Sequence, residues 1–387
     1  MTVQPRQDAA QPSRQGSPQP LPGTVREELV LERIDRTRRA RPRVREERIT
    51  MAHGAGGKAT QALVETIFLD AFRNELLEPL EDAARLHVGG SRLALTTDSY
   101  VVSPLFFPGG DIGDLAVNGT VNDLSMAGAQ PRYLSAGFIL EEGFGVGDLT
   151  RIAGSMRAAA QAAGVQIVTG DTKVVERGKA DGCYINTAGV GLISAGVELG
   201  VARARPGDAI IVSGPIGDHG VTIMLARGGL ELEADLESDT APLNGLVAAL
   251  LAGTSGLSPH GGSAVRAMRD ATRGGVATIL NEIALAADVG VLVREDAIPV
   301  RDQVRGAAEL LGIDPMYVAC EGRMVVVVDG DQAGAALRAL RAHPAGAQAS
   351  VIGEVIAEPA GIVQLRTAFG GTRIVDLLVG DPLPRIC

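Results

Sequence analysis

The sequence contains no tryptophan, and aromatic residues make up only 3% of its 387 residues. Proteins that bind single-stranded nucleic acid stack bases on aromatic side chains, so the composition argues against that class. The formal net charge of −10 also opposes binding to phosphate backbones and anionic membranes. The longest weakly polar run, residues 243–257, is too short and too polar to span a bilayer. We therefore expect neither a nucleic-acid partner nor a membrane.

Cysteine is also scarce. The three cysteines are Cys183, Cys320 and Cys387, and no two of them form a CxxC pair. This pattern argues against a disulfide scaffold and against a cysteine-rich zinc site, and it predicts a reducing, cytoplasmic setting. Glycine, by contrast, is abundant, with 50 residues, which indicates many tight turns and backbone-lined sites.

The chain divides into four regions. Residues 1–47 are rich in Pro, Gln and Ser and carry a basic run at 36–43. This composition is typical of a disordered extension, with an arm that binds nucleic acid or a partner as the alternative. Residues 48–202 and 203–370 each mix strand and helix patterns without strict βαβ regularity, which predicts an α+β fold with mixed α/β layers in two domains. Residues 371–387 contain two closely spaced prolines and predict an extended, mobile arm.

Local patterns predict the following elements. In the first domain we expect strands at 93–97 and 165–168 and helices at 112–126 and 148–163; in the second, strands at 209–213, 324–328 and 349–355 and helices at 220–226 and 274–287.

A glycine-rich segment at 53–60 precedes a predicted helix. It fails the P-loop spacing and the dinucleotide fingerprint. The N–H groups of Gly56 and Gly57 nevertheless stand where a helix N-terminus attracts phosphate. Both a phosphate site and a purely structural turn remain open for this segment.

Three predicted turns carry an aspartate, namely Asp98, Asp123 and Asp171. Carboxylates that converge at strand ends suit Mg²⁺, which retains water and phosphate ligands. The alternative is that each one stabilises its own turn. Lys173, two residues after Asp171, strengthens the case for a phosphate site.

Two further turns precede helices in the second domain. The segment 269–275 presents two arginines at a helix start, which suits an anion. His219 lies between a strand and a helix, and we interpret it as a hydrogen-bonded turn histidine rather than a catalyst. The other histidines are too scattered to suggest a metal site.

The last residue, Cys387, is the most informative one. A final residue on a proline-rich arm has little to pack against, and an exposed thiol is an oxidation liability unless it is used. It cannot be a prenylation box, which needs cysteine fourth from the end. A mobile arm that ends in a thiol is suited to carrying a chemical group between active sites.

Several motifs together resemble the HypE family of hydrogenase maturation factors. They lie at 97–102, 104–110, 131–135, 138–143, 170–175, 270–276 and 384–387, within a resemblance that spans residues 48–387. The segment 318–322 also resembles the family, although Cys320 departs from its pattern. Cys183 and Cys320 are assigned no role.

The resemblance implies a fold shared with aminoimidazole ribonucleotide synthetase and selenophosphate synthetase. In that superfamily the N-terminal domain forms a homodimer, and ATP lies in a cleft between the domains. The family's reaction starts when the carbamoyltransferase HypF loads a carbamoyl group onto the terminal thiol. ATP-dependent dehydration then gives a thiocyanate, and the cyanide passes to iron on a HypC–HypD complex for a nickel–iron hydrogenase.

The resemblance also implies residue roles. Cys387 would be the carrier, Lys173 would stabilise the transferring phosphoryl group, and Glu321 would be the base. Asp98, Asp123 and Asp171 would hold Mg²⁺, and Gly56, Gly57, Thr172 and Lys173 would complete the ATP site. Gly380 is a plausible hinge for the arm.

Two rival interpretations remain. A selenophosphate synthetase or thiamin-phosphate kinase would use a diffusible substrate and would not need a terminal thiol. A non-catalytic docking scaffold would not need the acidic residues or Lys173.

Overall fold

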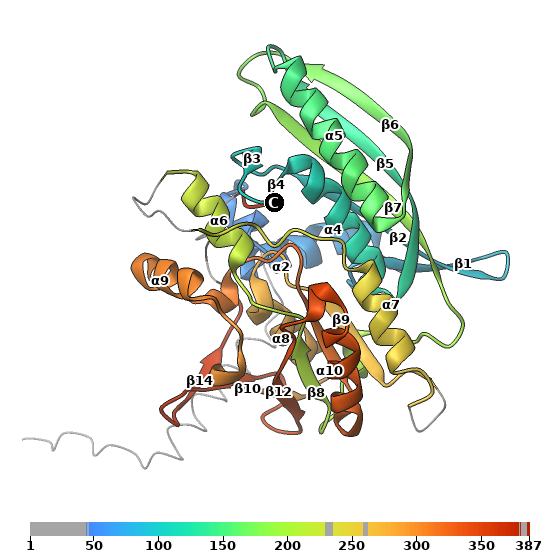
Figure 1. Ribbon diagram of the computed structural model, residues 1–387, viewed down its shortest axis with the longest axis vertical. Helices are drawn as coiled ribbons and strands as arrows, with labels where there is room; N and C mark the ends of the chain where they lie inside the picture. Colours follow the sequence, from blue (N-terminus) through green and yellow to red (C-terminus); the bar gives the residue numbers. More distant parts are fainter. Residues whose placement is uncertain (1–43, 45, 229–234, 258–261, 379, 381–384) are drawn as a thin grey trace, which may run out of the picture. The chain divides into compact units, whose positions relative to one another are not determined.

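The computed structural model describes residues 44, 46–228, 235–257, 262–378, 380 and 385–387 (Figure 1). Most of the predicted extension 1–47 lies outside the described residues, as do Pro382 and Pro384 of the predicted arm. No helix in the described part combines the length and apolar character that a bilayer crossing requires.

The first sheet has the strand order β1-β2-β7-β5-β6. Its strands are β1 (Ala84–Val88), β2 (Ser91–Tyr100), β5 (Ala129–Glu141), β6 (Gln166–Val175) and β7 (Cys183–Ile193). The strands β5 and β6 are parallel, and the other pairs are antiparallel. The strand β1 pairs with β2 only as far as Leu95, and β6 forms the opposite edge.

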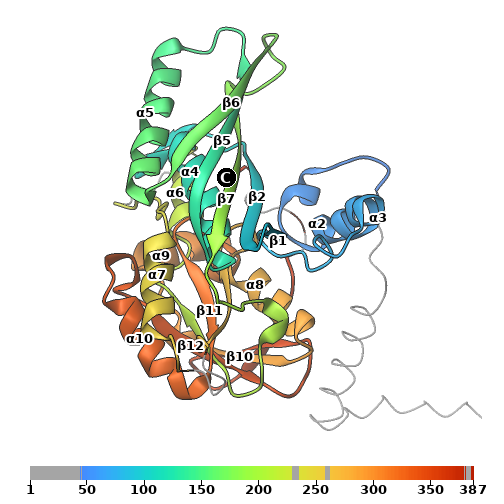
Figure 2. The same ribbon diagram turned by 90° about the vertical axis from the view of Figure 1, so that its right-hand side faces the viewer.

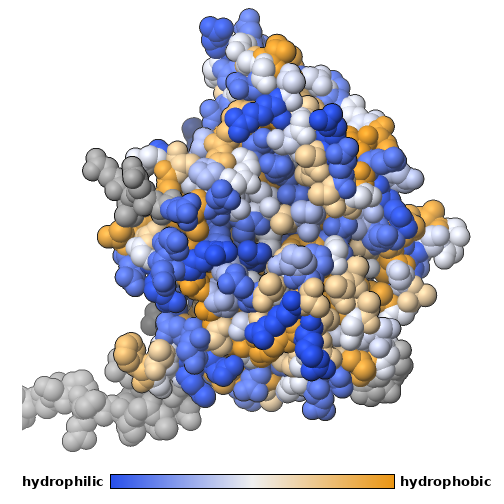
Figure 3. Space-filling model, viewed as in Figure 1, coloured by the Kyte–Doolittle hydropathy of each residue, from blue (hydrophilic) through white to orange (hydrophobic). Residues whose placement is uncertain are grey.

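Helix α4 (Ile112–Met126) lies against β2, β5 and β7, and α5 (Val146–Ala163) packs on α4, so both helices cover the same face of the sheet (Figure 2). The side chain of Asp111 caps α4 by accepting from the backbone N–H groups of Gly113 and Asp114. Gly164, at φ 68°, ends α5 in the left-handed conformation that favours glycine. Figure 3 views the side on which α5 lies and shows hydrophilic residues mixed among hydrophobic ones.

The other face of this sheet is bare. Pairing places Leu95, Tyr133, Ile139 and Leu192 on it together, and all four are exposed large hydrophobic residues. An apolar sheet face beside an open edge strand commonly marks an interface.

The second sheet has the strand order β14-β13-β10-β12-β8-β11-β9. Its strands are β8 (Ala209–Val212), β9 (Val265–Asp270), β10 (Gly290–Arg294), β11 (Met324–Val328), β12 (Ser350–Ile356), β13 (Val363–Arg366) and β14 (Thr372–Val375). Every residue of β8 and β11 is buried, as expected for central strands covered on both faces. One face packs into a core with α8 (Gly275–Ala286), and the other packs against α7 (Asn244–Gly253) and α10 (Ala333–Arg341).

Smaller elements surround these layers. They are α2 (Lys58–Leu63), α3 (Leu69–Phe72), β3 (Phe106–Phe107), β4 (Gly110–Asp111), α6 (Asp218–Ala226), α9 (Asp302–Leu311) and single helical turns at Met51–Gly54, Val64–Phe68, Val201–Arg203, Glu295–Ala297, Pro315–Tyr317, Gly330–Gln332 and Pro344–Gly346. Residues of α6 and α9 join the core of the first sheet. Both sheets belong to one compact unit, Pro42–Cys387. The predicted domain boundary at 202/203 falls between the sheets and remains a prediction.

The structure agrees with most of the elements expected from local patterns, and α4 has the predicted bounds. The prediction that three aspartates lie in turns is wrong: Asp98 lies within β2, Asp123 within α4 and Asp171 within β6. Helix and strand pairing continue through these positions and override the turn preference of aspartate. The first residues of the predicted arm form β14, which pairs with β13, so the chain leaves the sheet only at Asp376.

Asn122 connects the two halves of the unit, and we expect its replacement to be costly. Its side chain accepts from Leu243 N at 2.7 Å and donates to Ala241 O at 3.1 Å and to Glu321 O at 3.3 Å, in a buried site. Asn122→Ala leaves these buried backbone groups without hydrogen-bond partners. It should therefore lower the free energy of unfolding by roughly 3 kcal/mol in urea denaturation.

Asn74→Ala is the matched control. Asn74 also makes hydrogen bonds to three backbone groups, but on the surface, where water replaces them. Its loss should cost below about 1 kcal/mol. Equal losses in the two variants would contradict the connecting role of Asn122.

Candidate functional site

A cavity of about 280 Å³ lies where the first sheet, α4 and the loop after β9 meet. The groups on its wall that bear on chemistry are Asp82, Asp98, Asp123, Arg273, Glu321 and Cys387. They come from far-separated parts of the chain, so the fold rather than a local motif assembles this site.

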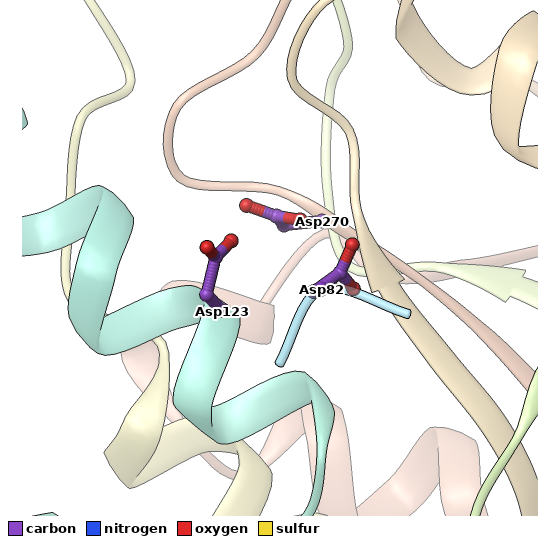
Figure 4. Close-up of side chains that lie close together, drawn as sticks. All are labelled: Asp82, Asp123 and Asp270. Atoms are coloured by element: carbon purple, nitrogen blue, oxygen red, sulfur yellow. The ribbon is translucent and has the colours of Figure 1, made fainter. Parts of the chain in front are cut away.

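Three aspartates form a cluster beside this cavity. One carboxylate oxygen each from Asp82, Asp123 and Asp270 lies within 4.8 Å of the others. Figure 4 shows the three carboxyl groups, from the segment before β1, from α4 and from the end of β9, turned toward a common space. Thr96 donates its hydroxyl to Asp123 at 2.8 Å.

The cluster is electrostatically costly without a cation. Burial, reinforced by the neighbouring carboxylates, raises the pKa of Asp82 and Asp123 well above the usual range, and it raises the pKa of Asp270 to about 6. Arg269 opposes the shift at Asp82 through an ion pair of 2.9 Å. The buried Oδ2 of Asp82 has no hydrogen-bond partner in the protein. An all-oxygen set with such an atom fits a hard divalent cation such as Mg²⁺.

Glu321 lies on the same cavity wall and is buried. Its backbone N–H donates to Asp239 at 2.9 Å, whereas the side-chain Oε1 has no hydrogen-bond partner. Burial, followed by repulsion from Asp270 and Asp98, raises its pKa well above the usual range. A buried carboxyl group with a raised pKa is suited to accept a proton.

The C-terminus is folded into the molecule, and Cys387 lies on the wall of the cavity (Figure 1). Arg273 donates from Nε to the Cys387 Sγ at 3.0 Å. Burial raises the pKa of this thiol to about 12, although Arg273 acts in the opposite direction. A second cavity of about 120 Å³ lies on the other side of Cys387 and Arg273.

Comparison with known proteins identifies the family. Residues 80–193 match the family of AIR synthase related proteins, N-terminal domain, and residues 205–366 match the corresponding C-terminal domain. The chain is 55% identical over 340 residues to carbamoyl dehydratase HypE of Rhizobium leguminosarum bv. viciae, which covers 88% of this chain and 95% of that protein. The chain belongs to the HypE family.

Solved structures of HypE proteins agree with this assignment. A crystal structure of a HypE–HypF complex matches with a TM-score of 0.76 and 48% identity, covering 82% of this chain and 100% of that chain. A crystal structure of HypE in complex with ATP matches with a TM-score of 0.72 and 48% identity, covering 88% and 100%. The resemblance to the HypE family and the α+β fold class expected from the sequence are confirmed.

Several residues expected at a HypE site meet in the cavity, whereas those on β6 do not. Asp98, Asp123, Glu321 and Cys387 line it together. Asp171, Thr172 and Lys173 are exposed on β6, where the Lys173 Nζ lies 2.6 Å from an oxygen of Asp171.

The register shows why Lys173 cannot reach the cavity of its own chain. Asp171 pairs through Gly137 and Asn186 to Ser99 on β2, which is three strand spacings, or about 14 Å. Pairing with Ile139 also places Lys173 on the bare face, whereas Asp98 shares the opposite face with buried Tyr100.

The glycines of the predicted phosphate loop have a structural reason for their identity. A Cβ on Gly56, whose φ is +75°, would lie 2.8 Å from the carbonyl oxygen of Arg273, and one on Gly57 would lie 2.3 Å from that of Leu378. Gly56 lines the cavity. Binding of ATP by either glycine remains a prediction.

Asp82 and Asp270 were missed from the sequence. Asp270 lies in the segment 269–275, which was interpreted as an anion site with two arginines, and in the family motif 270–276, but it was given no role of its own. Asp82 follows Glu81 in a stretch without strand or helix periodicity and gives no local signal. The two other cysteines are not among the residues that line the cavity: Cys183 and Cys320 are fully buried, and burial raises the pKa of both thiols.

We expect the aspartate cluster to bind Mg²⁺ measurably. Mg²⁺ should raise the melting temperature of the wild-type protein, because a ligand that binds only the folded state adds about 2.7 kcal/mol at ~100 times its dissociation constant. Asp123→Asn and Asp270→Asn each remove a carboxylate ligand and should lose most of this shift in thermal unfolding.

Asp296→Asn, at an exposed position after β10, is the control and should respond to Mg²⁺ like the wild type. A shift of equal size in all four proteins would show that the cluster is not the cation site.

Proposed function

We propose that this chain is an ATP-dependent carbamoyl dehydratase of hydrogenase maturation that acts on a carbamoyl group bound to its own C-terminal thiol. The observation that carries this proposal is the position of Cys387: its Sγ contacts Arg273 on the wall of the cavity that contains Glu321 and Asp98, beside the aspartate cluster. The reaction converts the S-carboxamide to a thiocyanate in the cytoplasm. A superfamily enzyme with a diffusible substrate would not need a terminal thiol in this place.

The chemistry requires activation of a poor leaving group. The amide oxygen attacks the γ-phosphorus of ATP, ADP leaves, and one N–H proton is lost, giving an O-phosphorylated imidate. A base then removes the second N–H proton, the C–O bond breaks, and phosphate leaves. The products are the thiocyanate, ADP and phosphate. Such phosphoryl transfer depends on positioning and on charge neutralisation.

The residues of the cavity fit these steps. Glu321, with its unpartnered oxygen and raised pKa, is suited to remove the final N–H proton. Arg273 donates to the sulfur in the unloaded state and is placed to donate to the carboxamide oxygen after loading. Asp82, Asp123 and Asp270, with Asp98 nearby, would hold Mg²⁺, which would neutralise charge on the ATP phosphates.

The arm must leave this position during the cycle. A buried thiol beside the cavity is inaccessible to a loading enzyme, so Cys387 must move outward to receive its carbamoyl group from HypF and to pass cyanide to HypC–HypD. The segment 376–387, beyond β14, can extend about 40 Å. Gly380, with φ +89°, remains our candidate hinge.

Lys173 requires a second protomer if it takes part in the reaction. The strand β6 is an open edge, and residues 96–100 of β2 pair with no other described strand on the side of β1. In a homodimer that joins these two edges, the partner's Lys173 lies near the cavity that contains Asp98. The exposed apolar face that carries Leu95 and Tyr133 is buried in the same arrangement.

Intact-mass spectrometry tests the carrier role of Cys387. After loading by the carbamoyltransferase, the wild-type protein should lose the mass of one water when ATP is added. Deletion of Cys387 should abolish loading while ATP binding is nearly unchanged. Glu321→Gln should load and bind ATP but should not lose the mass of water, because the final N–H proton is not removed.

The pH dependence supplies a control for this assignment. Glu321 must be ionised to accept a proton, so the dehydration rate of the wild type should rise with pH through the raised pKa of Glu321. Dehydration by the truncated chain, or an unimpaired Glu321→Gln, would refute the assignment.

Mixed dimers test whether Lys173 acts across the interface. Co-expressed Lys173→Ala and Glu321→Gln chains should regain about a quarter of wild-type activity, because half of randomly assorted dimers are mixed and each mixed dimer has one intact site.

The control mixture is Glu321→Gln with Cys387→Ser, whose targets belong to the same chain's site; it should remain inactive. An inactive Lys173 mixture would remove Lys173 from the partner's site, while leaving the role of Cys387 intact.

A further inference from the structure

The docked tail is held mainly through its backbone. The Arg385 carbonyl accepts from Ser103 N at 3.2 Å and from Arg227 at 2.6 Å, and the Cys387 carbonyl accepts from Val101 N at 3.1 Å. The tail therefore adds a short antiparallel pairing beside residues 101–103, as in peptide recognition by strand addition.

The carbonyl between these two, that of Ile386, lies 2.6 Å from His219 Nε2. The Ile386 side chain belongs to the core of the first sheet, and His219 at the start of α6 is fully buried. The ring of His219 meets Phe107 edge-on with centroids 5.7 Å apart. Packing on several sides thus fixes the position of the imidazole. The ring contacts the tail from a buried position.

The hydrogen bonds around His219 determine its tautomer. The hydroxyl oxygen of Ser238 accepts from Thr240 N at 3.2 Å and lies 2.7 Å from His219 Nδ1. The Ser238 hydroxyl is thus placed to donate its proton to Nδ1. The ring proton then resides on Nε2 and points at Ile386 O, which can only accept.

We propose that His219 is a positioning residue that holds the docked tail by donating from Nε2 to the Ile386 carbonyl, which places the Cys387 sulfur at the cavity. This proposal rests on the proposed function, in which docking of the terminal thiol precedes dehydration. Burial lowers the pKa of His219 to about 4, so the ring is neutral near physiological pH and retains this tautomer.

The short segment of Ser238 and Asp239 contacts both His219 and Glu321. Ser238 sets the His219 tautomer, and its neighbour Asp239 accepts from the Glu321 backbone N–H at 2.9 Å. When the tail leaves, the buried Nε2–H loses its protein acceptor, which costs free energy. His219 therefore favours the docked state through a contact that exists only in that state.

The labelling rate of Cys387 by N-ethylmaleimide in the full-length protein tests this proposal, with the C-terminal peptide quantified by mass spectrometry. Labelling requires undocking, so His219→Leu, which lacks the donor, should label roughly five-fold faster than the wild type, the effect of one hydrogen bond. His219→Gln retains an N–H near the same place and should stay close to the wild-type rate. His343→Gln, a histidine that caps a turn elsewhere, should not change the rate.

Cys183 and Cys320 report on folding in the same experiment, because both are fully buried and should label only if the variant unfolds. An unchanged Cys387 rate in folded His219→Leu, or equal rates for the Leu and Gln variants, would overturn the proposal. If His219→Leu exposes all three thiols, Ser238→Ala is the deciding variant. It removes the hydroxyl that donates to His219 Nδ1, so either tautomer becomes possible and Cys387 should label about two-fold faster than in the wild type. A wild-type labelling rate in Ser238→Ala would overturn the proposal. The assay needs neither ATP nor a carbamoyl donor, so its outcome is independent of whether the dehydratase chemistry is correct.

Discussion

Burial of several carboxyl groups around one small cavity is the constraint on which the rest of this structure depends. Asp82 and Asp123, which are partly buried, and Asp270, which is buried, share one space, and each has a raised pKa because the charged forms lose solvation and repel one another. Arg269 offsets part of this cost at Asp82. Such an arrangement is stable in its charged form only when a cation shares the space. The segment before β1, α4 and β9 each hold one of these groups in place, and the C-terminal tail brings the Cys387 thiol to the neighbouring cavity.

The tail is bound by interactions that are weak enough for reversible binding. Its last three carbonyls accept hydrogen bonds from Ser103, Arg227, His219 and Val101, and each bond contributes about 1 kcal/mol net. Burial of the Ile386 side chain adds roughly 2 kcal/mol. Against these gains stands the entropy of ordering the arm, about 1 kcal/mol or more for each residue fixed. A tail bound by a few hydrogen bonds and one buried side chain suits the alternation between docked and released states that the proposed reaction requires.

Local patterns predicted the elements well and the site only in part. The bounds of α4 follow from its cap at Asp111 and from apolar residues at helical spacing, and β11 follows from a run of buried aliphatic residues. Asp98 and Asp123 were singled out as aspartates of predicted turns and Cys387 as a thiol at the end of a proline-rich arm, whereas Glu321 came only from the family resemblance. Asp82 was missed because the property that matters, its distance to Asp123 and Asp270, arises from tertiary packing. The location of Lys173 was equally hidden, since only the strand order shows that β6 is an edge and that this side chain faces away from Asp98.

The state of the docked thiol constrains the order of events. A thiol must ionise to attack an activated carbamoyl group, yet docking raises the pKa of Cys387 to about 12, so the docked sulfur is a poor nucleophile. In the proposed reaction, loading would therefore occur while the arm is outside. Once the carboxamide replaces the thiol proton, no ionisable group remains on the tail's sulfur, and the desolvation that opposed a thiolate no longer matters. The loaded arm can then return to the adjacent cavity of about 280 Å³, where Arg273 meets a neutral amide oxygen instead of a thiol. The burial that keeps the free cysteine un-ionised therefore does not oppose docking of a loaded one.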